Sequence, residues 1–464
     1  MVEPLWTSDE IAQAAGGRGS GPSFVATGVS IDTRTLEPGD VFVALTGERD
    51  GHEFVAQAQA KGAAGVLVSR PAEGAAILVD DTQIALERLG VTARERAPQA
   101  RRGAITGSVG KTSLTQAIAA ALSRAGPAHA SVKSYNNHIG VPLTLARMPR
   151  DTERAVFEVG MNHPGEISPL TRMIAPRAVA ITNVGPVHIE NFADGEAGVA
   201  RAKAEVFEGL TPGGVAVLNA DDRWFPALKS AAESAGGAVR TFGSAETCDA
   251  RLLGFELKDG AQVRATLHGR EIRFPLRQTG AHWGLMSLAA LLMLEALDVG
   301  LDDGLAALAA FEPLEGRGAA RAVRFDGGEF TLVDESYNAN PISVAAALKT
   351  LGARPAAGRR IVALTDMLEL GAEAQNLHAQ LAEPIQAAGV DLVFCAGPLM
   401  KSLFDALPPT RRGGYADDAA GLAPGLVRAI EPGDVVMVKG SRDSSAKALV
   451  EALAALELQP GETR

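Results

Sequence analysis

The chain has 464 residues, more than one hydrophobic core usually serves, so several domains are expected. Its hydrophobic fraction of 46% and charged fraction of 21% are ordinary for a globular protein. The formal net charge is −11, and no long run of Lys or Arg occurs. A nucleic-acid partner is therefore not expected, because proteins that bind nucleic acid normally carry a basic surface.

Targeting and redox signals are weak. The two cysteines, Cys248 and Cys395, are far apart, which argues against a disulfide framework or a zinc site and favours buried apolar positions. The N-terminus carries acids and lacks the basic and apolar segments of a signal peptide. No stretch approaches the roughly 18 apolar residues that span a bilayer. We expect a cytoplasmic protein without membrane insertion.

The first block, residues 1–85, predicts a small α/β domain. Thr7 and Glu10 have the spacing of a capping box at the start of a short helix. Residues 41–45 are typical of a buried strand, residues 52–63 of a helix and residues 65–68 of another strand.

The second block, residues 86–312, alternates apolar strands with helical patterns. Such strands indicate a mainly parallel sheet that is covered on both faces. Residues 238–276 lack clear helices and suggest a small antiparallel insertion. The predicted buried strands are 103–106, 155–159, 178–184 and 214–219.

The third block, residues 313–464, shows the same alternation with Ala-rich helices, and we expect a third α/β domain. The Gly- and Pro-rich segment 313–318 is a candidate hinge between the second and third domains. The predicted strands of this block are 330–335, 359–365, 391–397 and 434–440.

The strongest chemical signal is a glycine-rich turn between an apolar strand and a helix. Glycines let successive N–H groups point at phosphate oxygens, and the helix N-terminus adds positive potential. In this interpretation Lys111 reaches the β- and γ-phosphates of ATP, and the hydroxyl of Thr112 ligates Mg²⁺. The predicted phosphate loop consists of Gly107, Ser108, Val109, Gly110, Lys111, Thr112 and Ser113.

The loop departs from the general P-loop pattern, because two residues rather than four separate Gly107 from Gly110. A plain glycine turn is the alternative. The sequence contains neither the N-K-x-D tetrad that a GTPase needs nor the H-R-D catalytic loop of a protein kinase.

Two further side chains follow the next predicted strands. Glu158 stands near the carboxyl end of one strand and His188 just beyond the end of the following one. Ligands bind at this edge of open parallel sheets, so both side chains could meet Mg²⁺ beside the phosphates. The alternatives are a helix-capping acid for Glu158 and an ordinary loop histidine for His188. Lys203 lies on a later helix, where spacing alone favours a solvated surface lysine.

With these segments collected, the chain resembles the Mur ligase family of peptidoglycan synthesis over nearly its whole length. The segments that carry the resemblance are SIDTRTLEPGDVFVALTGERDGHEF, TGSVGKTS, YNNHIGVPLTL, FEVGMNHPGEI, ITNVGPVHIENF, AKAEVFEGL, DESYNANPIS, TDMLELG and VKGSR. The combination of YNANP and DMLELG is typical of the member that adds D-alanyl-D-alanine.

The resemblance implies three domains: a UDP-sugar-binding domain, a central P-loop ATPase and a Rossmann-like C-terminal domain. It implies ATP and Mg²⁺ as cofactors, and UDP-N-acetylmuramoyl-tripeptide and D-Ala-D-Ala as substrates of a monomeric enzyme. It also implies that Lys203 is carbamylated and joins Thr112, Glu158 and His188 as a metal ligand. Lys111, Lys203, His188 and Glu158 are then the catalytic residues.

The same resemblance assigns binding residues. Arg317 and Asn338 are expected to hold ATP, and Asn137 and His138 to lie near the substrate carboxylate. The residues expected to grip the nucleotide sugar are Ser30, Thr33, Arg34 and Thr46.

One departure from the family concerns the segment GAHWGLMSLAA, where Arg usually precedes the histidine and Asn follows it four residues later. This chain has Ala281 and Met286 instead, which puts an adenine contact in doubt.

The expected reaction activates the tripeptide carboxylate as an acyl phosphate, which the amine of D-Ala-D-Ala then attacks. The alternatives are another Mur-type or folylpolyglutamate-type carboxylate–amine ligase, or a nucleotide-regulated binding module without turnover.

Overall fold

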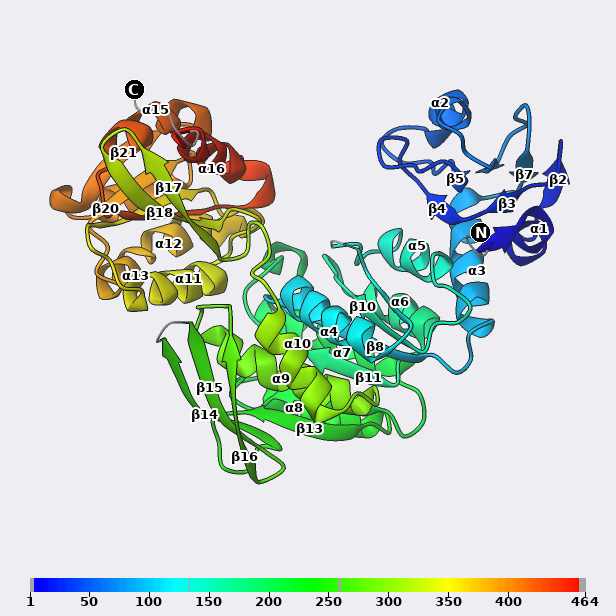
Figure 1. Ribbon diagram of the computed structural model, residues 1–464, viewed down its shortest axis with the longest axis horizontal. Helices are drawn as coiled ribbons and strands as arrows, with labels where there is room; N and C mark the ends of the chain where they lie inside the picture. The colour runs from blue at the N-terminus through cyan, green and yellow to red at the C-terminus, as the bar shows by residue number, and fades with distance from the viewer. Residues whose placement is uncertain (1–3, 133, 258–259, 459–464) are drawn as a thin grey trace.

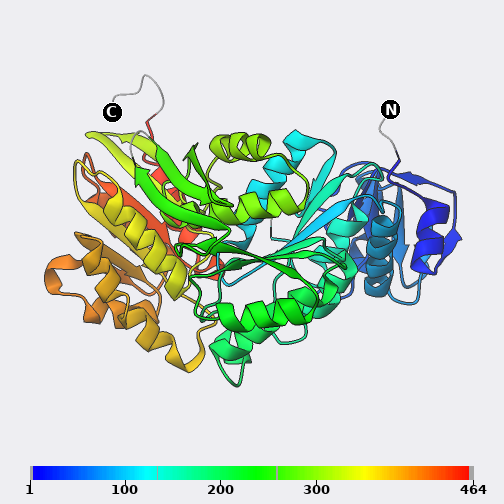
Figure 2. The same ribbon diagram turned by 90° about the horizontal axis from the view of Figure 1, so that it is seen from below.

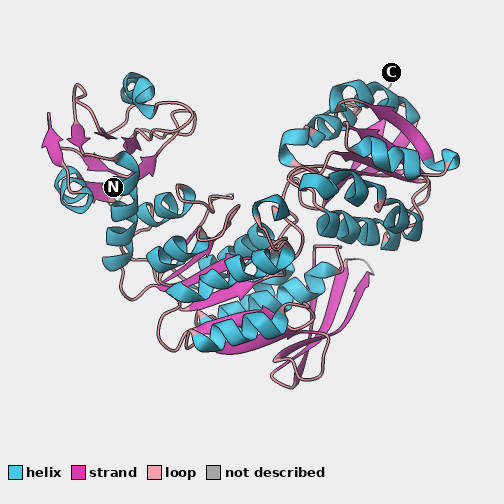
Figure 3. Ribbon diagram, turned by 180° about the vertical axis from the view of Figure 1, so that it is seen from behind, coloured by secondary structure: helices cyan, strands magenta, loops and turns pink. Residues whose placement is uncertain are grey.

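A computed structural model describes residues 4–132, 134–257 and 260–458. Figure 1 shows three bodies, with the N-terminal and C-terminal domains standing on either side of a central domain. The view from below in Figure 2 and the view from behind in Figure 3 show the same order, with helices covering the sheets. Among the described residues, no helix is both long and apolar enough to cross a bilayer. The expected three-domain α/β architecture is confirmed.

The N-terminal domain is built on a five-stranded sheet of order β2-β7-β6-β5-β4, parallel except for β2 at its edge. Helix α1 (Ser8–Ala15) begins at the predicted capping box, in which Thr7 and Glu10 each accept the other's backbone N–H. The strands of the sheet are β2 (Arg18–Ser20), β4 (Gly28–Ser30), β5 (Asp40–Val43), β6 (Gly65–Val68) and β7 (Ala76–Leu78). The remaining elements are β1 (Trp6–Thr7), β3 (Val25–Ala26), η1 (Gly51–Phe54) and α2 (Val55–Ala60).

Helix α3 (Thr82–Glu95) joins the N-terminal and central domains. Its apolar side chains belong to the N-terminal core, and it also packs closely on α5 (Gly140–Ala146). At Gly90 a β-carbon would lie 3.0 Å from the carbonyl oxygen of Pro142, so a larger residue would push the two closely packed helices apart by a few tenths of an ångström. The indole of Trp6 adds a hydrogen bond of 2.8 Å to the carbonyl of Ala146. The predicted domain boundary after residue 85 falls inside α3. It stays a prediction, as does the predicted boundary after residue 312.

The central domain contains a nine-stranded sheet of order β16-β15-β14-β13-β12-β11-β8-β10-β9. All four strands predicted for this domain are confirmed, within one to three residues at their ends. The strands are β8 (Arg101–Thr106), β9 (Ala128–Ala130), β10 (Arg154–Glu158), β11 (Ala178–Ile181), β12 (Val215–Asn219), β13 (Ala238–Gly243), β14 (Ala250–Leu257), β15 (Ala261–Leu267) and β16 (Arg270–Leu276).

Both faces of this sheet are buried, which explains the uniformly apolar strands. Along β10, Val156 joins the core under one face, whereas Ala155 and Phe157 join the core under the other. Helices α4 and α9 pack into the first core, and α5 to α8 into the second. The helical segments not yet given are α4 (Lys111–Ala125), α6 (Ile167–Ile174), η2 (Ile189–Asn191), α7 (Glu196–Ala204), η3 (Glu205–Gly209), α8 (Phe225–Ser234), α9 (His282–Ala296) and α10 (Leu301–Ala310).

The predicted insertion at residues 238–276 is partly wrong. Strands β14, β15 and β16 are antiparallel as expected, but β13 runs parallel to β12. The segment therefore extends the main sheet instead of forming a separate unit. The alternation of β15, whose residues are buried and exposed in turn, marks a sheet with one solvated face.

The C-terminal domain holds a six-stranded sheet of order β17-β18-β22-β19-β20-β21, parallel except for β17. The four predicted strands are confirmed, while β17 and β21 were not predicted. The strands are β17 (Ala319–Phe325), β18 (Gly328–Glu335), β19 (Arg360–Thr365), β20 (Leu392–Ala396), β21 (Arg412–Ala416) and β22 (Val435–Lys439). Its helical segments are α11 (Pro341–Ala353), η4 (Gly371–Glu373), α12 (Ala374–Ala379), α13 (Ala382–Ala387), α14 (Met400–Ala406), η5 (Pro409–Arg411), α15 (Ala419–Ala429), η6 (Arg442–Ser444) and α16 (Ala446–Ala454).

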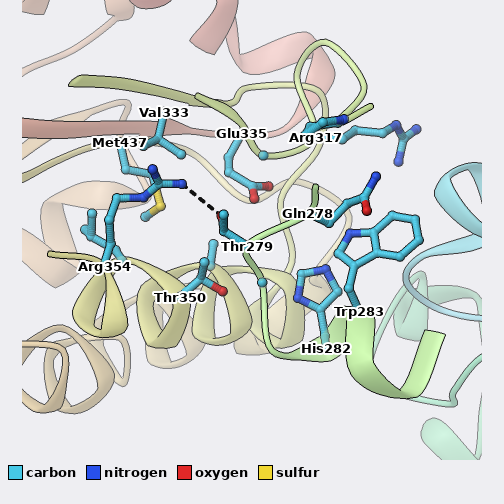
Figure 4. A pocket seen from close by; sticks show the side chains of 15 residues that line it. Gln278, Thr279, His282, Trp283, Arg317, Val333, Glu335, Thr350, Arg354 and Met437 are labelled. Atoms are coloured by element: carbon cyan, nitrogen blue, oxygen red, sulfur yellow. Dashed lines mark hydrogen bonds between the residues drawn. The ribbon is translucent and has the colours of Figure 1, made fainter. Parts of the chain in front are cut away.

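The C-terminal domain meets the central domain at a small pocket beside the predicted hinge (Figure 4). There Arg354, which directly follows α11, donates a hydrogen bond of 2.9 Å to the hydroxyl of Thr279 in the loop before α9. The two domains therefore touch on the side of the cleft described next.

Candidate active site

The predicted phosphate loop connects β8 to α4 as expected. Gly107 and Gly110 have φ angles of +148° and +86°, in the region that favours glycine, and a β-carbon on Gly107 would collide with Thr182. The backbone N–H of Ser108 donates to the carbonyl of Asn183, and that of Val109 to the Asn183 side-chain oxygen, both over 3.0 Å. The loop after β11 thus fixes the shape of the phosphate loop.

The ammonium of Lys111 bends back and donates to the carbonyl of Gly107 over 2.7 Å. Burial lowers the pKa of Lys111, while the nearby Glu158 carboxylate opposes this shift and Arg317 adds to it. A phosphate group placed in the loop would give the ammonium of Lys111 a further anionic partner.

Glu158 ends β10, and β8 lies next to β10 in the sheet, so this carboxylate stands beside the loop that follows β8. The side chain is 1% exposed, which excludes the helix-capping alternative. One carboxylate oxygen accepts a hydrogen bond of 2.6 Å from the amide of Asn136. The other oxygen is buried and has no hydrogen-bond partner, so it is free to coordinate a metal ion or accept a hydrogen bond.

The burial of Lys203 contradicts the prediction, made from its spacing, that it is a solvated surface lysine. It is 3% exposed at the end of α7, and burial, with the charge of Lys111, holds its pKa well below the ordinary value. Among the described residues, no carboxylate lies within salt-bridge distance of its ammonium group. A buried lysine without a counter-charge is costly unless it is neutral or modified.

His188 adopts a left-handed backbone conformation, with φ of +56°, just before η2. Burial, with the charges of Lys111 and Lys203, lowers its pKa to about 4, so the ring is neutral. Its Nδ1 lies 2.8 Å from a carboxylate oxygen of Glu369 in the C-terminal domain, but without hydrogen-bond geometry. This ring nitrogen is therefore also available to a ligand.

The C-terminal domain supplies the opposite wall of the cleft. The guanidinium of Arg317 donates to the hydroxyl of Thr112 over 3.0 Å and lies over the ring of Tyr337, 3.9 Å from its centre. The Tyr337 hydroxyl is 2.6 Å from that of Ser134, which in turn lies 3.3 Å from the Thr112 hydroxyl. The segment that was expected to act as a hinge therefore reaches the first turn of α4.

Asn338 lines the same cleft, and its side-chain oxygen accepts the backbone N–H of Ala339 over 2.9 Å. Its carbonyl accepts a hydrogen bond of 2.9 Å from the buried Lys439, which also donates to Glu335. Loops after β18 and β22 thus meet the phosphate loop at one cleft.

Ala281 and Met286, the two positions at which the chain departs from the family pattern, lie at different places relative to α9. Ala281 precedes the first residue of α9 and Met286 lies within that helix, against the phosphate loop. A β-carbon on Gly110 would lie 2.9 Å from the Met286 sulfur, so the thioether packs on the glycine. This wall of the cleft is apolar, since Trp283, Leu285 and Phe242 also line it.

The residues expected to bind the nucleotide sugar belong to the N-terminal domain and are not among the residues that line the cleft. Ser30 ends β4 and is buried; Thr33 donates to Gln57 over 2.9 Å. Arg34 extends into solvent and pairs with Asp32, while Thr46 bridges to Asp50.

Asn137 and His138 are divided between two environments. Asn137 lines the cleft, although its side-chain oxygen accepts the backbone N–H groups of Ile139 and Gly140 at the start of α5. The carbonyl of His138 accepts a hydrogen bond of 2.7 Å from Gln83 on α3. Both residues therefore stand between the cleft and the N-terminal domain.

Sequence reasoning missed several polar residues of the cleft, among them Asn136, Asn183 and Glu369. Asn136 and Asn183 lie inside recognised segments, so their position beside Glu158 and the phosphate loop could have been inferred from strand order. Nothing in the spacing marks Glu369, because its place depends on how two domains pack.

The described residues contain no group of three or more His, Cys, Asp or Glu side chains that could hold a metal ion. The predicted magnesium ligands are of a different kind, since Thr112 offers a hydroxyl and Lys203 an amine beside Glu158 and His188.

Comparisons with known proteins agree with this architecture. Sequence models of the Mur ligase family catalytic domain, the Mur ligase middle domain and the Mur ligase glutamate ligase domain match residues 25–98, 105–294 and 321–442, respectively. The UDP-N-acetylmuramoyl-tripeptide–D-alanyl-D-alanine ligase of Escherichia coli strain K12 is 34% identical, over 96% of this chain and 98% of its own.

Solved structures give the same result. MurF from Acinetobacter baumannii superposes with a TM-score of 0.85 at 29% identity, covering 98% of this chain and 99% of its own. MurF from Thermotoga maritima, solved in complex with ADP, shares the fold with a TM-score of 0.79 at 23% identity, over 92% of this chain and 97% of its own.

The three domain models and the fold are those of a Mur ligase, and the chain belongs to that family. Within the family, its similarity over nearly the full length is to UDP-N-acetylmuramoyl-tripeptide–D-alanyl-D-alanine ligases.

Proposed function

We propose that the chain is an ATP-dependent ligase that joins D-alanyl-D-alanine to the tripeptide carboxylate of UDP-N-acetylmuramoyl-tripeptide in peptidoglycan precursor synthesis. The observation that carries this proposal is the cleft itself, in which the glycine-rich loop with Lys111 faces a second domain, while the buried Lys203 lies close enough to Lys111 to feel its charge. The N-terminus of α4 and the ammonium of Lys111, which lie together in the cleft, suit a polyphosphate, and the second domain leaves room for an acceptor.

ATP is proposed to bind the loop of residues 107–113. Its phosphates would lie on the backbone N–H groups at the start of α4, because those of Ser108 and Val109 donate to Asn183. Lys111 would exchange its bond to Gly107 for the β- and γ-phosphates. Arg317 and Asn338 would hold the nucleotide from the C-terminal side, since both already line the cleft.

The side chains around the loop fit Mg²⁺. A buried carboxylate oxygen of Glu158 and the Nδ1 atom of His188 both lack hydrogen-bond partners, and the Thr112 hydroxyl is nearby. Carboxylate and hydroxyl oxygens are ligands that Mg²⁺ prefers. Bound there, the ion would offset negative charge on the phosphate oxygens.

Lys203 fits the role of a carbamylated ligand. Burial lowers the pKa of Lys203 and so favours the neutral amine, whose nitrogen can bond to the carbon of CO₂ and release one proton. The product is a carboxylate-like group, which supplies an oxygen ligand in place of the amine and adds an anion near Lys111.

The reaction is proposed to begin with attack of a tripeptide carboxylate oxygen on the γ-phosphorus, which forms the acyl phosphate and breaks the bond to ADP. Lys111 offsets charge on the transferred oxygens. The amine of the dipeptide then attacks the acyl carbon, loses a proton and expels phosphate. Arg317 and Tyr337, which close over the loop, would keep water from the intermediate.

The nucleotide-sugar end of the substrate is proposed to bind Ser30, Thr33, Arg34 and Thr46 in the N-terminal domain. Its peptide would then run past Asn137 and His138 to the cleft. Since one chain supplies both ends of this path, we further propose a monomeric enzyme that works in the cytoplasm; light scattering after gel filtration tests the monomer.

The test is a phosphate-release assay with ATP, UDP-N-acetylmuramoyl-tripeptide and a panel of amines. Release should require D-Ala-D-Ala and fail with diamino acids or glutamate, which separates this ligase from other Mur-type and folylpolyglutamate-type enzymes. Carboxylate labelled with ¹⁸O should pass label to the released phosphate. Release without either substrate, or unlabelled phosphate, overturns the proposal.

A further inference from the structure

The phosphate loop rests on residues 182–185, the segment directly after β11, which we call the brace. The hydroxyl of Thr182 donates to the carbonyl of Val109 over 2.6 Å, and the backbone N–H of Gly185 donates to the hydroxyl of Ser108 over 2.9 Å. The backbone and a side chain of the brace also accept two N–H groups of the loop. The shape of the phosphate loop therefore depends on where the brace lies.

The brace is itself held by the turn that follows β12. In the sheet β11 lies between β8 and β12, and these strands are parallel, so the brace lies between the phosphate loop and that turn. One carboxylate oxygen of Asp222 accepts the backbone N–H of Val184 over 2.7 Å, and the other accepts the N–H of Trp224 over 2.9 Å. The second bond closes a local turn of the kind that Asp commonly forms. Asp222 thus has one oxygen for its own turn and one for the brace.

The same turn is tied to the helix that carries Lys203. The indole N–H of Trp224 donates to a carboxylate oxygen of Glu196 over 2.8 Å, and the guanidinium of Arg223 donates to the same oxygen over 3.0 Å. Glu196 is the first residue of α7, and Lys203 lies in the last turn of that helix. The turn after β12 is therefore connected to two elements of the proposed site, the phosphate loop and the lysine helix.

Asp222 is not among the residues that line the cleft, so it would act on a nucleotide only through the brace. The adjacent Asp221 has a different partner, because its carboxylate accepts the N–H of Ser244 over 3.0 Å and the Ser244 hydroxyl over 2.9 Å. Both acids stabilise the same turn, but of the two only Asp222 bonds to the brace. Asp221 is therefore a matched control for Asp222.

We propose that Asp222 is a positioning residue for nucleotide binding. Its bond to Val184 keeps the brace where it shapes the phosphate loop, so that Lys111 and the N–H groups at the start of α4 face the phosphates. This assignment rests on the proposed ligase function and names a residue outside the cleft that supports its ATP site. Loss of the bond would let the brace shift and would weaken phosphate binding, while the amine site stays unchanged.

The first test is the binding of ADP with Mg²⁺, measured by titration calorimetry. In Asp222→Asn one acceptor oxygen must serve two N–H groups, so we expect Kd for ADP to rise by about tenfold. Asp222→Ser should give a similar rise, since a hydroxyl can keep the local bond to Trp224 but is too short to reach Val184. Asp221→Asn should bind ADP with the wild-type Kd. Thermal unfolding checks that each variant is folded.

The second test asks whether Asp222 acts through the brace, by a double-mutant cycle with Asn183→Ala. The loss of ADP affinity caused by Asp222→Asn should be smaller in the Asn183→Ala background than in the wild type. Full additivity would show that Asp222 does not act through the brace.

Turnover gives a readout that a general loss of stability would not produce. Asp222→Asn should raise KM for ATP and leave KM for D-Ala-D-Ala near the wild-type value. If both Asp222 variants bind ADP as the wild type does, the positioning assignment is wrong and the ligase function stands. A wild type that binds no ADP overturns the proposed function itself.

Discussion

Arg317 donates a hydrogen bond of 3.0 Å to Thr112, so a C-terminal-domain guanidinium rests on the first turn of the helix that follows the phosphate loop. This bond occupies the hydroxyl proposed as a magnesium ligand. We therefore expect the domain angle to change when nucleotide binds, and small-angle scattering with and without an ATP analogue should detect it. Identical curves would count against movement.

Removal of this contact should weaken nucleotide binding. Arg317→Ala loses a charged donor at the phosphate site, and we expect kcat/KM for ATP to fall by about tenfold or more. Steady-state kinetics with varied ATP measure this. Arg321→Ala removes an arginine of β17 that pairs with Glu457, and should leave the same parameter near the wild-type value.

Lys111 of the phosphate loop should contribute more to catalysis than Arg317. Lys111→Ala removes the cation closest to the transferred group, and we expect kcat to fall at least about 10²-fold. Phosphate release under saturating substrates gives the value, and a thermal scan confirms that the variant is folded. Catalysis that survives this change would refute the phosphate-loop assignment.

Lys203 offers a test that surface lysines cannot mimic. Lys203→Ala should lose most activity and regain part of it with added short carboxylates, because these can replace the missing oxygen ligand. Depletion of CO₂ should lower wild-type activity, and bicarbonate should restore it. A fully active Lys203→Ala enzyme would return this residue to a structural role.

Met286 should affect the choice of nucleotide. A thioether has no strong donor or acceptor with which to read a base, so we expect wild-type selectivity for ATP over GTP to be weak. Met286→Asn should increase the ATP-to-GTP ratio of kcat/KM. Equal use of both nucleotides by both enzymes would show that this helix does not contact the base.

The pH dependence of stability should show the contribution of His129. Burial is the main reason why its pKa is lowered to about 4, so the unfolded chain binds a proton at higher pH than the folded one. Stability from this group is therefore present above about pH 6.5 and lost as pH falls towards 4. Between pH 7 and 5 the wild type should lose about 2 kcal/mol more than His129→Gln, measured by urea unfolding.

The sequence pattern predicted the parts of the site that depend on residues close together in the chain or on the order of the strands. The phosphate loop was found because strand, glycines and helix are consecutive, and Glu158 because parallel strands end at one edge. Lys203 was placed wrongly by its spacing, since α7 is buried on several sides by neighbours remote in sequence. Glu369 gave no signal at all, because only domain packing brings it to His188.

Helix α3, which packs on α5 at Gly90, is the rigid connection between the N-terminal and central domains. One residue inserted in it would turn the N-terminal domain by about 100° and shift it by roughly 1.5 Å. Any molecule that spans both domains would then be pulled out of line, although neither binding surface had changed. The alignment of such a molecule thus depends on the length and pitch of the helix that joins the two domains.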